Sequence, residues 1–582
     1  MTRRFAIACV VAGLIAFPST GARQAPFRTL DDRFAPPRLT TIDAWKTHAE
    51  YVRAHVLASA GLLPMPEKTP LRPVIFDELT RADYRIAKVY FESIPGFFVT
   101  GNLYRPLGNG PFPAILSPHG HWTYGRLENT SLTSGPGRAI GLARQGFVVF
   151  TYDMIGYNDS QQLPHTFGGN AEKIWGLSLG GLQLWNGLRA LDFLETLPDV
   201  RQDAIGMTGE SGGGSQTFLL SAVDPRVKVA VPVNMISLKM QGGCLCENPP
   251  GLRLELTNVD IAASIAPRPM LMVSATGDWT NETMEVEYPA VRAVYDLFGA
   301  GDRVQAVRMT AEHNYNEDSR EAMYAWMARW FQGAAAGTKI EERSFSVEPL
   351  QDLLVFYRRA LPAEALTPAQ FTEAWVEAAK RQLTNPSAET ALALRHAIGS
   401  EASAATMDPV PAFTRTVLVA HSNPAVEKAI ASAGFRVKPI ALTPFDAAAA
   451  AEVKHFDTYN RTAAGQRIAD IAAAVRANPG AAIVAEGDVA LAAILAAGVA
   501  PVPVAILDVG RFDTSNDAAY LDHLYVPGLR RAGDLRTAAA LARGKLVIHN
   551  AGDRFAIGVD AQAQPLPPAE IVKTLQMSKG KR

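Results

Sequence analysis

The chain has very little cysteine, with three residues in 582, at positions 9, 244 and 246. This excludes a small fold stapled by several disulfides. Net charge is also nearly absent, at −1 from 56 basic and 57 acidic residues, so nothing electrostatic favours nucleic acid or an anionic membrane as a partner. A hydrophobic content of 48% is globular, and 582 residues are too many for one ordinary core, so we expect two domains.

The apolar run at the N-terminus is too short to cross a membrane. It covers residues 5–17, follows Arg3 and Arg4, and is followed by the small residues Thr20 and Ala22. This pattern predicts a signal peptide over residues 1–22, and therefore a secreted or periplasmic protein with no membrane span after cleavage. An uncleaved N-terminal anchor is the alternative.

A strand, a glycine-rich turn carrying a serine, and a helix are predicted around Ser211. Residues 204–207 are short and apolar, Gly209-Glu210-Ser211-Gly212-Gly213 follows, and residues 214–220 have a helical pattern. This is the pattern of a nucleophile elbow, where glycines permit a strained serine backbone. A second Gly-x-Ser-x-Gly match holds Ser178 but follows no strand-like segment, so we expect Ser211 to be the nucleophile.

An acid and a base follow Ser211 in the order that this elbow requires. A buried strand over residues 269–274 leads into Gly277-Asp278, and a strand over residues 304–309 leads into Glu312-His313-Asn314. We predict that His313 is the general base and that Asp278 orients it. Glu247, which follows the predicted strand 229–233, is the alternative acid.

Two further loops are expected at the same edge of the sheet. His119-Gly120-His121-Trp122 follows the strand 112–116, and the backbone N–H groups of His121 or Trp122, with that of Gly212, would form the oxyanion hole. A second loop follows the strand 147–152. We expect the substrate pocket to be lined by His119, Asp153, Tyr157 and Trp279.

We expect no metal and no cofactor. His119 and His121 could suggest a metal pair, but an i, i+2 spacing on a turn, with no nearby Cys or further His, is poor ligand geometry. Cys244 and Cys246 are predicted to be partly buried thiols near the active site, because a Cys-x-Cys pair rarely closes a relaxed disulfide. A strained, redox-labile bridge is the alternative.

Residues 86–331 resemble the acetyl xylan esterase-like and dienelactone-hydrolase-like branch of the α/β-hydrolase superfamily. The resemblance rests on Pro118-His119-Gly120-His121, Gly209 to Gly214, Gly277-Asp278 and Glu312-His313-Asn314. It implies a mostly parallel sheet with helices on both faces. It also implies serine ester hydrolysis, often of acetyl groups on polysaccharides such as xylan.

The substrate stays open between a small ester and a polysaccharide. The elbow lacks the Ser-Gln-Gly-Gly of cephalosporin deacetylases and the Cys-Ser-Arg of glucuronoyl esterases. A glucuronoyl-type esterase and a serine peptidase of the prolyl-oligopeptidase type are the alternatives. The peptidase is disfavoured because the segment between the signal peptide and the catalytic core is too short for a propeller domain.

We expect a helical and extended segment over 23–85, a catalytic domain over 86–335, a helical linker over 336–409 and a C-terminal α/β domain over 410–582. The last domain has strand-like segments at 417–420, 437–440, 482–485, 502–507 and 545–548. An offset of about 275 residues places Gly487 at the position of Ser211 and aligns Asp553 with Asp278. We therefore predict a domain without a triad, either a degenerate hydrolase repeat or an unrelated α/β domain.

Overall fold

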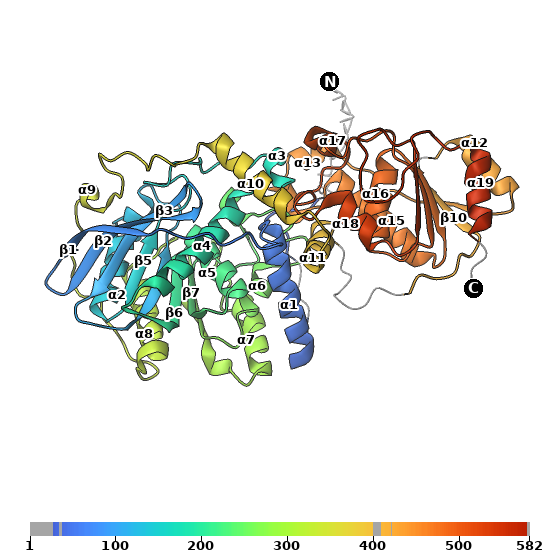
Figure 1. Ribbon diagram of the computed structural model, residues 1–582. Coiled ribbons are helices and arrows are strands. Elements are labelled where there is room, and N and C mark those ends of the chain that lie inside the picture. Colours follow the sequence, from blue (N-terminus) through green and yellow to red (C-terminus); the bar gives the residue numbers. More distant parts are fainter. Residues whose placement is uncertain (1–26, 34–37, 400–408, 421, 579–582) are drawn as a thin grey trace, which may run out of the picture.

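The computed structural model describes residues 27–33, 38–399, 409–420 and 422–578, which form two α/β domains side by side (Figure 1). The predicted signal peptide, residues 1–22, lies outside the described residues. Among the helices of the described ranges, none combines the length and the apolar character that a membrane span requires.

The first domain is built on a nine-stranded sheet in the order β1-β2-β3-β5-β4-β6-β7-β8-β9. Strands β1, β2, β3 and β5 pair antiparallel with their neighbours in that order. The remaining neighbours, in the order β5-β4-β6-β7-β8-β9, all pair parallel. The predicted α/β-hydrolase fold is therefore confirmed. The strands are β1 (Val74–Thr80), β2 (Tyr84–Ile94), β3 (Phe97–Pro106), β4 (Phe112–Pro118), β5 (Val148–Tyr152), β6 (Val200–Glu210), β7 (Val227–Val233), β8 (Met270–Ala275) and β9 (Val304–Met309).

Helices cover both faces of this sheet. Alternate strand residues point to opposite sides, and apolar residues on both sides must be buried. On β4, Ala114 and Leu116 belong to one apolar core, whereas Ile115 belongs to the other. The first core packs against α1 (Ile42–Ser59), α4 (Leu179–Thr196), α5 (Gly212–Val223), α6 (Asn258–Ala263) and α7 (Glu287–Leu297). The second packs against α2 (Gly135–Arg144) and α8 (Glu317–Gln332).

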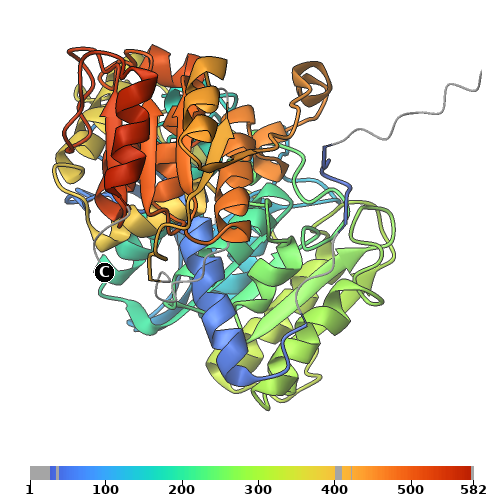
Figure 2. The same ribbon diagram turned by 90° about the vertical axis from the view of Figure 1, so that its right-hand side faces the viewer.

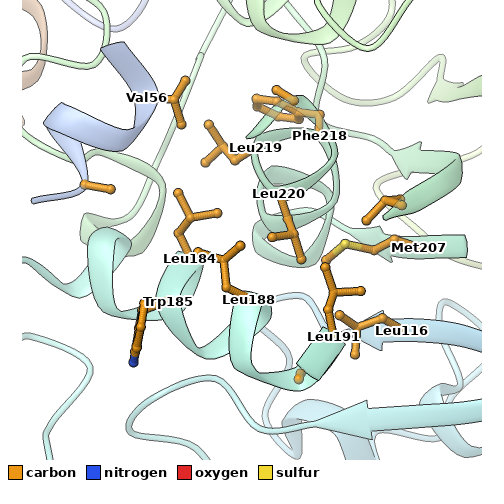
Figure 3. Packing of buried hydrophobic residues seen from close by; sticks show 14 of the residues in the cluster. Val56, Leu116, Leu184, Trp185, Leu188, Leu191, Met207, Phe218, Leu219 and Leu220 are labelled. Atoms are coloured by element: carbon orange, nitrogen blue, oxygen red, sulfur yellow. The ribbon is translucent and has the colours of Figure 1, made fainter. Parts of the chain in front are cut away.

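Helix α5 is held tightly beneath the predicted nucleophile. Figure 3 shows Leu219 and Leu220 of α5 facing Leu184 and Leu188 of α4, and Met207 of β6 close by. All five side chains are at most 5% exposed. This dry packing fixes the strand and helix that flank Ser211, so the turn between them has a defined position.

Between the two domains runs a helical connection. In α10 (Pro368–Gln382), Phe371 and Trp375 pack into the first core, whereas Ala393 and Leu394 of α11 (Ala388–Ala397) pack into the core of the second domain. Two short helices also belong to the first domain: α3 (Asn170–Lys173) contacts the second domain, and α9 (Leu350–Leu353) packs into the second core through Leu353.

The second domain holds a five-stranded, wholly parallel sheet in the order β11-β10-β12-β13-β14. Its strands are β10 (Thr416–Ala420), β11 (Arg436–Pro439), β12 (Ala482–Glu486), β13 (Val504–Asp508) and β14 (Lys545–His549). Parallel neighbours require crossover connections, which are supplied by the alanine-rich helices. The helices between its strands are α12 (Pro424–Ser432), α13 (Ala447–Ala451), α14 (Phe456–Tyr459), α15 (Ala463–Ala477), α16 (Asp488–Ala497), α17 (Asp517–His523) and α18 (Asp534–Leu541), and α19 (Pro568–Met577) follows β14.

The domains meet along α1, which lies below the second domain in Figure 2. His55 of α1 and His396 of α11 are both buried, with their Nδ1 atoms 3.1 Å apart. Backbone hydrogen bonds join α14 to the first domain, from Gly251 N to Asp457 O at 2.7 Å and from Arg253 N to Thr458 O at 3.0 Å. The second domain therefore packs on the loop that follows β7.

Candidate active site

Ser211 occupies the sharp turn between β6 and α5. Its backbone angles are φ 55° and ψ −121°, a conformation that costs a non-glycine residue free energy. A Cβ atom on Gly209 or Gly213 would lie 2.6 or 2.7 Å from the carbonyl oxygen of Pro118, so only glycine fits at these two positions. The turn has the geometry of a nucleophile elbow.

Asp278 and His313 are brought together from the loops that follow β8 and β9. The Nδ1 atom of His313 lies 2.9 Å from Oδ2 of Asp278. The other carboxylate oxygen of Asp278 accepts hydrogen bonds from Thr280 N at 2.7 Å and Thr280 Oγ1 at 2.5 Å. When Nδ1–H donates to the carboxylate, Nε2 of His313 is left as the basic nitrogen, which is the tautomer that a general base needs.

The two loops approach each other closely at Gly277. Its N–H donates to Ala311 O at 2.9 Å, and a Cβ on Gly277 would lie 3.0 Å from the Cα of Glu312. A larger residue at position 277 would push the acid loop away from the His313 loop. The side chain of Asp278 is 2% exposed and that of His313 is 25% exposed, so the ring keeps one edge open while the acid is sealed.

Two tryptophan rings lie against the imidazole of His313. The ring centroid of Trp279 is 4.4 Å away and that of Trp122 is 5.9 Å away. Trp122 is fixed in turn, because its Nε1 donates to Oε1 of Glu210 at 2.8 Å. These rings restrict the orientation of the candidate base.

Glu210, the residue before the candidate nucleophile, is a buried anchor that the sequence analysis did not identify. Its Oε2 pairs with Nη1 of Arg138 at 2.8 Å, and its Oε1 also accepts from Thr133 Oγ1 at 3.1 Å. A buried carboxylate needs such partners. The signal available in the sequence was an acidic residue inside an otherwise apolar strand end.

One of the backbone N–H groups predicted for the oxyanion hole already has a hydrogen-bond acceptor in the structure. The backbone N–H of Trp122 donates to Gly120 O at 2.9 Å, so it is engaged. The N–H of His121 has no acceptor among the described residues, and that of Gly212 is the first donor of α5, where helices leave N–H groups unpaired. His121 and Gly212 are therefore the donors that remain for an oxyanion.

The alternative acid, Glu247, lies in a different network. It belongs to the 3-10 turn η2 (Leu245–Glu247), and its Oε2 accepts hydrogen bonds from the backbone N–H groups of Gly243 at 2.7 Å and Cys244 at 2.9 Å. Its Oε1 is 3.4 Å from Ser215 Oγ. Ser178, the serine of the second Gly-x-Ser-x-Gly match, caps α4, where its Oγ accepts a hydrogen bond from Gly181 N at 3.1 Å.

Two residues predicted to line the substrate pocket instead support the loops from below. His119 donates from Nδ1 to Gly120 O at 2.7 Å and accepts at Nε2 from Met154 N at 2.9 Å, and burial lowers its pKa to about 3. Asp153 accepts from Thr100 Oγ1 at 2.7 Å and Asn158 Nδ2 at 2.8 Å, and burial raises its pKa to about 6. Both are at most 2% exposed, so neither can face a ligand.

A Cys₂His₂ cluster lies beside the elbow, and it corrects the expectation that His121 has no Cys or further His nearby. The candidate ligand atoms of His121, His165, Cys244 and Cys246 all lie within 4.8 Å of one another. Both cysteines are free thiols, so the structure does not contain the alternative Cys244–Cys246 disulfide. The cluster was missed because its residues are far apart in the sequence. The available signal was that they follow β4, β5 and β7 at one sheet edge.

The cluster has unusual electrostatics. A hydrogen bond with Cys246, followed by contacts with His121 and His165, lowers the pKa of Cys244, while burial raises that of Cys246. The ring of Tyr157, another predicted pocket residue, lies 5.0 Å from that of His165 and 6.3 Å from that of His121. Burial, with the two cysteines, raises the pKa of Tyr157 to about 12. Tyr157 thus packs against both histidines of the cluster.

Comparisons with known proteins find relatives that are named as hydrolases or esterases. No protein-family model matches the chain. A Bacillus subtilis (strain 168) protein named "Putative hydrolase YtaP" is 26% identical over 255 residues, which cover 41% of this chain and 84% of that protein. The solved structure of Methylesterase BT1017 is 28% identical, with a TM-score of 0.50, covering 60% of this chain and 78% of the other.

A more distant match is a carbohydrate esterase family 15 glucuronoyl esterase from Caldicellulosiruptor kristjansonii, at 16% identity and a TM-score of 0.36, covering 56% of this chain and 97% of the other. The sheet order and the elbow define the chain as a protein of the α/β-hydrolase fold. The chain is similar to one protein named as a hydrolase and one named as a methylesterase, in line with the resemblance drawn from the motifs.

Proposed function

We propose that this protein is a secreted serine carboxylic-ester hydrolase that works through Ser211, His313 and Asp278. The observation that carries the proposal is the 2.9 Å contact between Nδ1 of His313 and Asp278, on loops beside a strained serine elbow. The similarity to a hydrolase and a methylesterase supports the same chemistry. The signal-peptide pattern over residues 1–22 supports export.

In the proposed reaction, Ser211 Oγ attacks the ester carbonyl while Nε2 of His313 takes its proton. Asp278 stabilises the imidazolium that forms. The N–H groups of His121 and Gly212 donate to the oxyanion of the tetrahedral intermediate. His313 then returns the proton to the departing alcohol, which leaves an acyl-enzyme on Ser211. Attack by water, again with His313 as base, releases the acid.

The acyl group distinguishes two candidate substrates. An acetyl ester on a polysaccharide such as xylan follows from the motif resemblance. A methyl ester of a sugar acid is the second candidate, and it is favoured by the 28% identity to a protein named as a methylesterase. In the first case Ser211 becomes acetylated and the sugar hydroxyl leaves, whereas in the second Ser211 becomes esterified by the sugar acid and methanol leaves.

The test is a substrate screen with purified protein. p-Nitrophenyl acetate, longer acyl esters, acetylated xylan and a methyl glucuronate ester are compared by kcat/KM, with release of acetate and methanol measured separately. Hydrolysis of any of these that disappears in Ser211→Ala supports the proposal. Absence of turnover on all four, in folded protein, contradicts it.

A further inference from the structure

We propose that His121, His165, Cys244 and Cys246 bind one zinc ion beside the nucleophile elbow. The soft thiolates and the two imidazoles form a donor set that Zn²⁺ prefers. The site is separate from the triad.

The spacing of the ligand atoms fits a tetrahedral ion. Nε2 of His121 is 3.1 Å from Sγ of Cys246, and Nε2 of His165 is 3.3 Å from Sγ of Cys244. Neighbouring ligands around tetrahedral zinc are separated by about 3.3–3.8 Å, given Zn–N and Zn–S bonds of about 2.0–2.3 Å. All four atoms lie within 4.8 Å of one another, so a single ion can reach them all after small adjustments.

One of the two histidines has the outer hydrogen bond that is usual for a zinc ligand, and the turn that carries the two cysteines is held by Glu247. His165 donates from Nδ1 to the carbonyl oxygen of Ile155 at 2.6 Å, which leaves Nε2 as the free donor toward Cys244. Glu247 holds the N–H groups of Gly243 and Cys244 and so shapes the turn that presents both thiols. The carbonyl of Gly243 also accepts a hydrogen bond from Nζ of Lys454 in the second domain.

Four protein ligands complete a tetrahedral shell, so the ion would be structural rather than one that activates water. It would tie together the loops after β4, β5 and β7 around the elbow that follows β6. The ring of His121 lies over the elbow, because a Cβ on Gly212 would be 2.5 Å from its Cε1. The zinc ion would thereby hold the backbone N–H of His121 near the proposed oxyanion position.

Metal content tests the site without reference to activity. Full-length protein, purified without chelator, should contain one zinc per chain by plasma mass spectrometry. Apoprotein reduced and titrated with Co²⁺ should develop the intense visible and near-ultraviolet bands of tetrahedral, thiolate-bound cobalt. A mercurial that blocks thiols should release zinc from the wild-type protein to a chromophoric chelator, which requires no variant.

Variants locate the ion. Cys246→Ser and His165→Gln should lose the bound zinc, whereas His523→Asn should keep it, because His523 is exposed in the second domain. If wild-type protein, as purified and after reduction and reconstitution, binds neither zinc nor cobalt, or if the two ligand variants bind as much as the control, the proposal is overturned. A native Cys244–Cys246 disulfide that takes up no metal after reduction also overturns it.

The link to catalysis is a separate measurement, and it rests on the proposed esterase function. Removing zinc should lower kcat more than it raises KM, by up to about 10²–10³-fold, the effect of losing one oxyanion donor. If zinc binds but its removal leaves kcat unchanged, the metal site stands and its role in positioning the His121 N–H is rejected. Zinc binding in a protein without any esterase activity would leave the metal site intact and reject the proposed function.

Discussion

The turn at Ser211 in the first domain and the turn at Gly487 in the second have nearly the same backbone. Each connects a central parallel strand to a helix, β6 to α5 and β12 to α16. Ser211 has φ 55° and ψ −121°, and Gly487 has φ 61° and ψ −137°. The N–H of Ser211 donates to Val233 O at the end of β7, and that of Gly487 donates to Asp508 O at the end of β13.

The sheets around the two turns also correspond. The order β5-β4-β6-β7-β8 in the first domain is matched by β11-β10-β12-β13-β14 in the second. The strands β8 and β14 lead into Gly277-Asp278 and Gly552-Asp553. These matches favour the degenerate hydrolase repeat over an unrelated domain. Among the described residues no strand follows β14 as β9 follows β8.

The comparison shows that the elbow is a property of the fold, whereas the chemistry depends on what surrounds it. Around Ser211, glycines, Trp122 and a buried ion pair enclose the turn. At Gly487, an added Cβ would meet no heavy atom within 4 Å, and a cavity of about 270 Å³ is open beside it. The second domain retains the scaffold without the enclosure that a catalytic serine needs.

The largest expected effect is the loss of kcat when the serine of the first elbow is removed. Ser211→Ala should lower kcat by about 10³–10⁶-fold, because the members of a triad act as a unit. The control Ser178→Ala should keep its activity and lose about 1 kcal/mol of stability, since it removes only a helix cap. Esterase kinetics and a serine-reactive probe measure both. Strong residual activity in Ser211→Ala, with the probe attached beyond Val410, would show that the second domain carries an active serine of its own.

The two acid positions give the next contrast. Asp278→Asn should lower kcat by about 10⁴-fold, because the amide no longer holds the correct tautomer of His313. Asp553→Asn, at the corresponding loop of the second domain, should leave kcat and KM unchanged. Glu247→Gln discriminates the alternative: if it abolished turnover while Asp278→Asn kept it, the acid would be Glu247.

The sequence predicted the elements of the parallel sheets well, because buried strands followed by glycine-rich loops are strong local signals. It did not single out the antiparallel strands β1 to β3. Strands β2 and β3 are buried on both faces, so they lack the alternation that marks a strand, and β1 is a largely exposed edge.

Chain order also paired Asp278 with His313, but it could not predict which polar residues would be buried. His119 and Asp153 looked like pocket residues, yet each is satisfied internally by hydrogen bonds to residues from other loops. The Cys₂His₂ cluster was missed for the same physical reason. Its members follow different strands, so their proximity is set by the order of strands in the sheet rather than by spacing along the chain.

Acid should weaken the contact between the domains. Burial lowers the pKa of His55 to about 4 and that of His396 to about 3, from an ordinary 6.5. Both depressed values mean that the unfolded chain binds protons first. Their contribution to stability is therefore full above pH 6.5 and is lost as the pH falls toward 4. For His55 the loss is roughly 3 kcal/mol, at about 1.4 kcal/mol per pKa unit.

Thermal unfolding followed from pH 7 to pH 4 measures this loss. His396→Leu should make the acid dependence of Tm shallower, since it removes one group that must stay neutral. The exposed His523→Asn should leave the slope unchanged. An acid slope that is identical in wild-type protein and His396→Leu would show that this interface does not respond to acid, and would remove one reason to treat the two domains as coupled.

The smallest effect is expected from giving the second elbow a serine. Gly487→Ser should fold, because there is space for its side chain, but its positive φ should cost about 1–3 kcal/mol of stability. In a Ser211→Ala background it should restore no esterase activity, because no described histidine follows β14 at the position that His313 occupies after β9. Denaturant unfolding and probe labelling measure the two outcomes. Labelling of the new serine, with turnover of p-nitrophenyl acetate, would mean that the second domain still holds a working site and lacks only its nucleophile.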